Sequence, residues 1–452
     1  MRPSTTWRTS WPSTPPRKYL RPCPPESSTG TIEIDRGSEA MSQLQGSLHP
    51  DFAGVARTLR KIVPKKGPGG AAVCVYHRGE KVVDIWGGTK DDRGTPWAED
   101  TVSISFSTTK GVASTLLHIY ADRGLIDLEA PVSTYWPEFA AAGKEEVKVR
   151  HLLCHEAGMY SIEDVVEDAH DMQDWDKMIE RLGAAPARHA PGAAHGYHAM
   201  TYGWLVGEIV RRVAGGKSFA DLVAAEIAGP LDLDGLYCGV PEDQQHRCAQ
   251  LMAAGMDAPP EEARRRTERM RVGAERWRDR LRRLGFRYDP TESLAALLAP
   301  GMESLDMNSA AWRSASVPAA NGMFTARSLA RMYACLAAGG ELDGVRLLSD
   351  QHLRKAARQQ NDGAGKVIPV SMRWRLGYHR VFAVPHRMPG AFGHFGFGGS
   401  GGWADPAREL AVALTVNSGV GTPFGDSRIV RIGSAAVRCA NARRIALPAQ
   451  AS

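Results

Sequence analysis

The segments patterned like β-strands lie at the two ends of this chain, and a long helical stretch separates them. The β-like runs are residues 71–76, 81–86, 373–379, 392–397 and 410–416. The first two are joined by His77-Arg-Gly-Glu80, which is typical of a hairpin loop. The pattern from about residue 150 to 315 is mainly helical, with Gly and Pro breaks.

Strands from opposite chain ends can share one sheet only if the chain returns after its helical stretch. We therefore predict a mixed α/β (α+β) domain built from residues 46–150 and 316–445, with a helical domain inserted at 151–315. A catalytic cleft is expected where the two domains meet.

The first 45 residues differ from the rest of the chain. Residues 1–25 contain seven prolines and five basic residues but no acidic residue. They lack the apolar core of a secretory signal, and the prolines oppose an amphipathic helix. We interpret residues 1–45 as a disordered tail, with Met41 as an alternative start of the natural chain.

Composition argues against several functional classes. The formal net charge of +6 over 452 residues is small and not confined to one block, which does not indicate nucleic-acid binding. The seven cysteines are scattered and include no Cys-x-x-Cys pair, which favours reduced thiols in a cytoplasmic protein over disulfides or a zinc site. No apolar run approaches the roughly 20 residues of a membrane span. We expect no nucleic-acid or membrane partner, and the sequence does not indicate an oligomeric state.

Ser107 and Lys110 form the first candidate for chemistry. They fall at the start of a predicted helix that ends near Gly124, and a spacing of three places them on one face. A serine hydroxyl needs a base beside it, and Lys110 can serve only if its pKa falls from about 10.4 toward neutrality. Taken alone, the pair is more typical of an N-cap serine followed by a surface lysine.

Two glycine-rich matches near the C-terminal end do not fit their usual contexts. Gly398-Gly-Ser400-Gly-Gly402 matches the nucleophile elbow G-x-S-x-G, which needs a helix after it and a later histidine. The continuation here is strand, turn and strand, and no histidine follows His394. The overlapping G-x-G-x-x-G over residues 396–401 lacks the helix that a dinucleotide site requires.

Three distant segments together form a more specific pattern. They are Ser107-x-x-Lys110, the stretch Pro191-Gly-Ala-Ala-His-Gly-Tyr197-His-Ala199, and His394-Phe-Gly396. In these, the chain resembles the serine β-lactamase and penicillin-binding-protein superfamily, and most of all the family VIII carboxylesterases, which are similar to class C β-lactamases. The resemblance spans about residues 50–440. Further stretches that carry it are 124–132, 151–158, 228–233 and 322–327.

The resemblance implies a β-lactamase/transpeptidase-like fold, with an antiparallel sheet flanked by helices, and it implies a role for each matched residue. Ser107 is the expected nucleophile, Lys110 takes or relays its proton, and Tyr197 is the partner acid and base. The backbone N–H groups of Ser107 and Phe397 are the expected oxyanion hole, and His394 and Gly396 are expected to line the substrate site. The resemblance implies no metal and no organic cofactor.

Two alternatives remain open for the tyrosine. Tyr197 by itself is more typical of a buried core residue with a satisfied hydroxyl, and only the ordered set of motifs favours catalysis. Tyr202, five residues later, is a rival for the catalytic role, but it fits the helix that follows, whereas Tyr197 directly follows a Pro-Gly loop.

Two departures from the family pattern bear on the substrate. Ala199 stands where the superfamily has the Asn of Tyr-x-Asn, and His394 stands where it has the Lys of Lys-Thr-Gly. A mostly neutral histidine and an alanine are poor ligands for a lactam's carboxylate and amide. We therefore expect a carboxylesterase for uncharged esters, and the family resemblance implies short acyl chains. The alternatives are an acyltransferase, a β-lactamase or a D-amino-acid peptidase using the same residues, or a non-catalytic binding member of the fold.

Two charged runs are assigned no catalytic role. Residues 163–180 contain eight acidic residues, and residues 264–287 contain eleven arginines interleaved with Met270, Trp277, Leu281 and Leu284. We interpret both as solvated helix faces. For the arginine run, contact with an acidic partner is the alternative.

Overall fold

The computed structural model describes residues 44–252, 258–286, 288–419 and 426–443. Of the predicted tail, residues 1–43 lie outside the described residues, and Gln45 already belongs to strand β1 (Gln45–Leu48). Within the described residues no helix is long and apolar enough to cross a bilayer.

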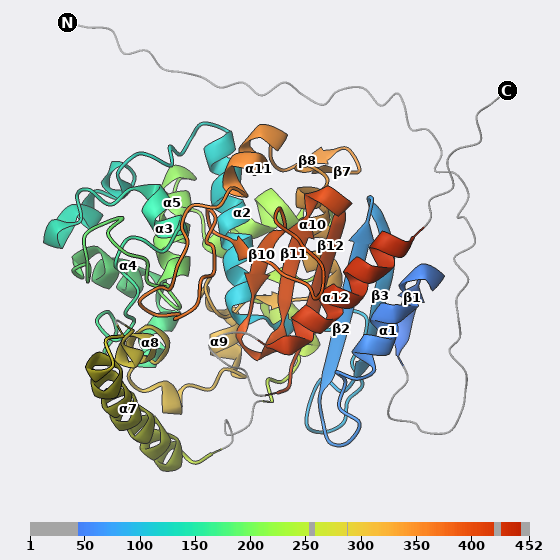
Figure 1. Cartoon of the computed structure of the whole chain (residues 1–452), viewed down its shortest axis with the longest axis horizontal. Helices are drawn as coiled ribbons and strands as arrows, with labels where there is room; N and C mark the ends of the chain where they lie inside the picture. Colours follow the sequence, from blue (N-terminus) through green and yellow to red (C-terminus); the bar gives the residue numbers. More distant parts are fainter. Residues whose placement is uncertain (1–43, 253–257, 287, 420–425, 444–452) are drawn as a thin grey trace, which may run out of the picture.

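Both chain ends contribute to one seven-stranded antiparallel sheet, as predicted (Figure 1). The strand order is β1-β3-β2-β12-β11-β10-β9. Beyond β1, the strands are β2 (Gly70–His77), β3 (Glu80–Gly88), β9 (His379–Arg380), β10 (Phe392–Phe395), β11 (Gly401–Asp405) and β12 (Leu410–Val416). The chain ends meet in the middle of the sheet, where β2 pairs with β12 and Val75 lies opposite Val412.

Helices cover both faces of the sheet because its central strands are apolar on both sides. Val73 and Val75 of β2 face the cluster that contains α1 (Ala53–Leu59) and α12 (Ser427–Ala442). Cys74 and Tyr76 alternate to the other face, where α10 (Ala326–Ala337) and α2 (Thr109–Asp122) pack. The mixed fold class is therefore confirmed, as an open antiparallel sheet with helices from both ends.

Helix α2 is the central element of the molecule. All of its residues from Thr109 to Tyr120 are buried. They include Lys110, Ser114 and His118, which share one face of the helix and are hydrogen-bonded inside the protein. It contacts β10 on one side and α5 (Tyr202–Val213) on the other. The start of α2 therefore lies where the sheet meets the helical part of the chain.

The rest of the described chain contains further helices and two small sheets. The helices are α3 (Val149–Leu153), α4 (Trp175–Ala184), α6 (Phe219–Val223), α7 (Pro260–Arg283), α8 (Pro290–Leu297) and α9 (Ala310–Ser314), and α11 (Asp350–Ala356) follows α10. A three-stranded sheet has the order β4 (Ser103–Ile104), β6 (Met323–Phe324) and β5 (Leu236–Tyr237), and β7 (Glu341–Leu342) pairs with β8 (Val345–Arg346). The division into two domains at residues 151 and 315 stays a prediction.

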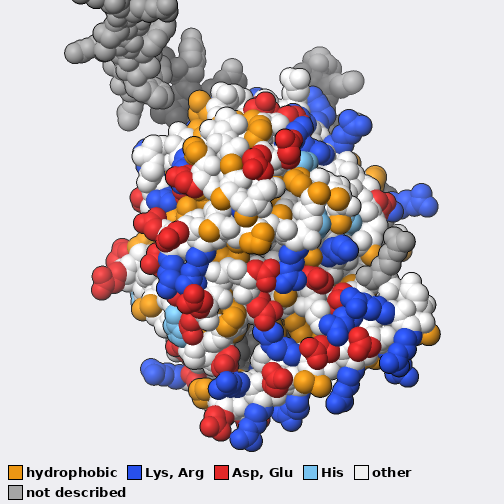
Figure 2. All heavy atoms as spheres, turned by 90° about the vertical axis from the view of Figure 1, so that its left-hand side faces the viewer, with side chains coloured by type: hydrophobic (Ala, Val, Ile, Leu, Met, Phe, Trp, Pro, Cys, Tyr) orange, Lys and Arg blue, Asp and Glu red, His pale blue; other side chains and the backbone are white. Residues whose placement is uncertain are grey.

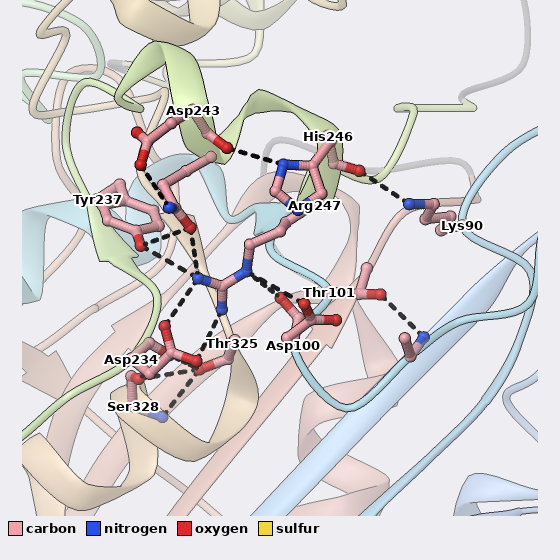
Figure 3. A network of polar contacts seen from close by, with 12 residues as sticks. Lys90, Asp100, Thr101, Asp234, Tyr237, Asp243, His246, Arg247, Thr325 and Ser328 are labelled. Carbon is pink, nitrogen blue, oxygen red and sulfur yellow. Dashed lines mark hydrogen bonds and ion pairs between the residues drawn. The ribbon is translucent and has the colours of Figure 1, made fainter.

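An arginine network fixes the segment that leads into β4 (Figure 3). The Arg247 guanidinium donates to both carboxylate oxygens of Asp234, at 2.7 and 3.0 Å, and to the backbone carbonyl of Asp100 at 3.0 Å. Val102 in turn donates its backbone N–H to the Arg247 carbonyl at 3.1 Å. Since Val102 precedes β4 directly, these bonds hold the approach to Ser107 in place.

One strand prediction is wrong for most of its length. Residues 373–379 are predicted as a strand, but only His379 pairs in the sheet, as the first residue of β9. Trp374 is buried among aromatic rings, and the Arg375 guanidinium donates to the backbone carbonyls of Pro389 and Ala391 at 2.8 and 3.0 Å. The β-like side chains of this segment therefore pack as a loop, since tertiary contacts outweigh strand propensity.

Candidate active site

Ser107 lies in a tight turn between β4 and α2. A 3-10 turn over Phe106–Thr108 precedes the helix, and Phe106 has a left-handed φ of 43°. Such a backbone costs a non-glycine residue about 1–3 kcal/mol, and residues of this kind cluster at functional sites. The consequence here is a half-buried Ser107 at the start of a fully buried helix.

Lys110 is completely buried and its amine has three oxygen neighbours. Its Nζ lies 3.0 Å from Ser107 Oγ, 2.7 Å from the carbonyl of Ala199 and 2.9 Å from the carbonyl of Ala319. Burial lowers the pKa of Lys110 well below its usual range, and no acidic side chain acts in the opposite direction. The amine is therefore held toward its neutral form, which is the form that can accept a proton.

The structure brings Tyr197, and not Tyr202, to Ser107 and Lys110. The Tyr197 ring lies 4.9 Å from Lys110 Nζ, and its side chain is close enough to Ser107 for the serine to act on the tyrosine pKa. Burial raises the pKa of Tyr197, and Ser107 acts in the opposite direction. Tyr202 is the first residue of α5, and its hydroxyl is hydrogen-bonded to Ser114 at 2.7 Å.

Strand β10 supplies the opposite wall. His394 is 2% exposed, its ring lies 6.2 Å from that of Tyr197, and its Nδ1 is 3.1 Å from the Phe395 carbonyl. Among the described residues, its Nε2 has no hydrogen-bond partner. Burial lowers the pKa of His394 well below its usual range, and His379 and Lys110 lower it further, so the imidazole is neutral.

The end of β10 touches the turn that carries Ser107. A Cβ at Gly396 would lie 2.2 Å from the backbone oxygen of Ser105, so only glycine permits this approach. Phe397 follows, 40% exposed, with its ring 5.5 Å from that of Phe106. The predicted oxyanion and substrate residues thus flank the Ser107 turn.

The other glycine-rich matches are accounted for by the sheet. Ser400 is buried between β10 and β11, and its hydroxyl accepts a hydrogen bond from the Val416 backbone N–H at 3.1 Å. Strand β11 follows it, and not a helix. Neither a nucleophile elbow nor a dinucleotide loop is present at this position.

Sequence reasoning missed a set of aromatic residues behind Tyr197. Trp374 stacks on Tyr197 with ring centres 5.3 Å apart, and the His155 ring approaches it edge-on at 4.9 Å. His155 Nδ1 lies 3.2 Å from His198 Nδ1. Burial lowers the pKa of His155 well below its usual range, and lowers that of His198 to about 3 and that of His379 to about 4. The site is therefore lined with neutral imidazoles.

The available sequence signals for these residues were weak. His155 lies in one of the stretches that resemble the family, and His198 directly follows Tyr197. Neither position reveals burial or contact. In the parts of the chain that the structure describes, no group of three or more His, Cys, Asp or Glu residues is arranged to hold a metal ion.

Comparisons with known proteins agree on one family. The family model described as Beta-lactamase matches residues 55–437. The chain is 38% identical over 389 residues to the protein named Esterase/beta-lactamase LipL of Mycobacterium tuberculosis (strain ATCC 25618 / H37Rv), covering 84% of each. Among solved structures, it is similar to a family VIII carboxylesterase (35% identity, TM-score 0.74) and to a penicillin-binding protein homolog from Caulobacter crescentus (32%, 0.74). In both cases 88% of this chain and 100% of the other are covered.

Proposed function

The chain belongs to the beta-lactamase family and is a hydrolase of that fold, and from this premise we propose that it is a serine carboxylesterase acting on short-chain esters. In this proposal Ser107 forms the acyl-enzyme, and Lys110 and Tyr197 move the protons. The names of the esterase relatives support ester hydrolysis as the reaction.

The environment of the Lys110 amine is the observation that carries the proposal. A neutral amine has two N–H donors and one lone pair. The carbonyls of Ala199 and Ala319 can accept both N–H groups, so the lone pair is left for the Ser107 hydroxyl at 3.0 Å. Burial lowers the pKa of the amine and so favours its neutral form, which is the form that can act as a general base in contact with the nucleophile.

The chemical steps follow from this arrangement. Ser107 Oγ attacks the ester carbonyl carbon while its proton passes to Lys110. The backbone N–H groups of Ser107 and Phe397 bind the oxyanion, a contribution typically worth about 2.7–4 kcal/mol for each donor. The C–O bond to the alcohol breaks as Tyr197 gives its proton to the leaving oxygen, and Lys110 passes the serine's proton on to Tyr197. Water then attacks the acyl carbon and gives a proton to the same pair. The bond between that carbon and Ser107 Oγ breaks as Oγ takes a proton back from the pair, which releases the carboxylic acid.

Two features support esters over lactams as substrates. The side chain of Ala199 offers no amide, and its backbone carbonyl is already bound to Lys110. His394 is neutral, so it provides no cation for a substrate carboxylate. We further propose a cytoplasmic location, which is supported by the free thiols of all six described cysteines.

A substrate panel with a labelling test decides among the activities. We expect p-nitrophenyl butyrate to be hydrolysed far faster than nitrocefin or a D-alanyl peptide, and a fluorophosphonate probe to label Ser107, as read by peptide mass spectrometry. Ser107→Ala should keep the fold and lose essentially all turnover. A Ser107→Ala protein that hydrolyses the ester normally refutes the assignment, and efficient nitrocefin turnover by the wild type replaces the esterase with a β-lactamase.

A further inference from the structure

Helix α7 is the longest helix in the described chain, and it buries almost none of its surface. Of its 24 residues, only Ala274 is buried. It packs mainly on α8 and on the short turn Met302–Ser304, at the edge of the molecule away from the seven-stranded sheet (Figure 1). A helix of about 36 Å with so little burial has most of its faces available to a partner.

Exposed apolar side chains are concentrated on and just after this helix. The described residues include ten exposed large hydrophobic side chains, and five of them are Met270, Val272, Trp277, Leu284 and Phe286. Met270, Trp277 and Leu284 are 42%, 56% and 66% exposed. Their spacing of seven residues, almost two helical turns, aligns them in one stripe about 20 Å long. Isolated exposed side chains are ordinary, but such a stripe indicates an interaction surface.

Arginines border the stripe on one side. Arg269, Arg276 and Arg283 each directly precede a stripe residue, and in the described structure none of the three makes an ion pair. The acidic residues Glu268 and Glu275 lie two positions before a stripe residue, about 200° around the helix from it. Helix α7 as a whole contains ten arginines and five acidic residues. Figure 2 shows many Lys and Arg side chains, with Asp and Glu side chains among them, over the lower part of the side on which α7 lies.

We propose that this stripe docks on an anionic lipid surface. Trp277, Leu284 and their neighbours enter the boundary between headgroups and acyl chains, and the bordering arginines pair with headgroup phosphates. A basic helix lying in the plane of the surface requires no membrane-spanning segment. A second copy of the chain packed antiparallel on the stripe would place its arginines along the same edge, where like charges repel one another. The proposal replaces two expectations from the sequence, the solvated helix face and the absence of a membrane partner, and it does not depend on the esterase assignment.

Vesicle co-sedimentation of the full chain tests the proposal. We expect the wild type to bind vesicles of phosphatidylcholine with phosphatidylglycerol at low salt, and not to bind vesicles of phosphatidylcholine alone. The charge variant R269Q/R276Q/R283Q should bind the anionic vesicles about a hundredfold more weakly. The apolar variant W277S/L284S should lose at least about tenfold. Both should melt and hydrolyse a water-soluble ester like the wild type.

Matched controls separate this surface from charge or hydrophobicity in general. R57Q/K61Q/R438Q removes three unpaired cations from a groove of about 740 Å³ between α1 and α12. L125S/V384S removes two apolar side chains that are 51% and 62% exposed. Both controls should bind vesicles like the wild type.

The proposal is refuted if the wild type does not bind anionic vesicles. It is also refuted if the α7 variants bind these vesicles as tightly as the wild type, or if the groove control loses as much binding as the α7 charge variant. A wild type that ignores vesicles but binds an acidic helical peptide through the same residues assigns the stripe to a protein partner and refutes the lipid assignment.

Discussion

Replacing Gly396 with alanine tests whether the two walls of the proposed site must touch. The new Cβ would lie 2.2 Å from the Ser105 carbonyl oxygen, whereas ordinary contacts begin at 3.4 Å. The end of β10 and the Ser107 turn must therefore separate by about 1 Å, since a packed interior cannot absorb the overlap. Ser107 lies two residues after Ser105, and Phe397 directly follows Gly396, so this separation moves the two proposed oxyanion donors apart.

The expected loss follows from the weakened oxyanion contact. Misplacement of reacting groups by 1 Å costs about 10²-fold, and loss of one oxyanion donor costs about 10²–10³-fold in kcat. We expect kcat/KM for p-nitrophenyl butyrate to fall about 100-fold in Gly396→Ala, or about 2.7 kcal/mol. The rate of fluorophosphonate labelling should fall with it, because acylation is the affected step.

Gly390→Ala is the matched control. Gly390 lies between β9 and β10, and a Cβ there meets nothing within 4 Å. This variant should retain wild-type kinetics, and thermal melting should show that both variants are folded. A folded Gly396→Ala enzyme with kcat/KM within about threefold of the wild type refutes the argument that this contact positions the oxyanion donors.

The remaining predictions concern the proton-transfer pair. Tyr197→Phe should lower kcat by about 10²–10⁴-fold. Tyr202→Phe loses only the hydrogen bond to Ser114, so it should lower the free energy of unfolding by about 1 kcal/mol and change the activity little. Equal kinetic losses in the two variants contradict the assignment of Tyr197. Lys110 is held neutral in the folded protein at pH values where the unfolded chain, with a lysine pKa of about 10.4, still binds the proton. Unfolding therefore takes up a proton, so the free energy of unfolding should rise with pH toward about 10.4, and Lys110→Met should lack that rise. Urea unfolding from about pH 7 to pH 9 measures the difference, and parallel curves for the two proteins exclude a neutral Lys110.

Local patterns in the sequence predict much of the framework. The run 410–416 coincides with β12, and the helix predicted from Ala326 to Leu336 ends one residue later, at Ala337. Strand alternation and helix caps are properties of neighbouring residues, so they can be identified without the fold. The prediction that Tyr197 lies in a loop before a helix also rests on neighbouring residues alone.

The remainder depends on contacts between residues that are far apart in the chain. Trp374 and His155 reach Tyr197 only through tertiary packing, and no spacing rule connects their positions. The neutrality of Lys110 follows from its burial, which one sequence does not report. The fit of Gly396 against Ser105 is likewise a meeting of two distant segments, so a glycine in a strand-like run does not predict it.

The pairing of β2 with β12 determines when this protein can begin to fold. The Gly70 backbone N–H donates to the Asn417 side chain across 347 positions of sequence, so the middle of the sheet closes one of the longest loops that the chain allows. Contacts of such high sequence separation make folding slow. During synthesis, nearly the whole chain must emerge before β12 can pair with the free edge of β2. We therefore expect chains truncated before residue 410 to aggregate through that open strand edge, whichever helices have already formed.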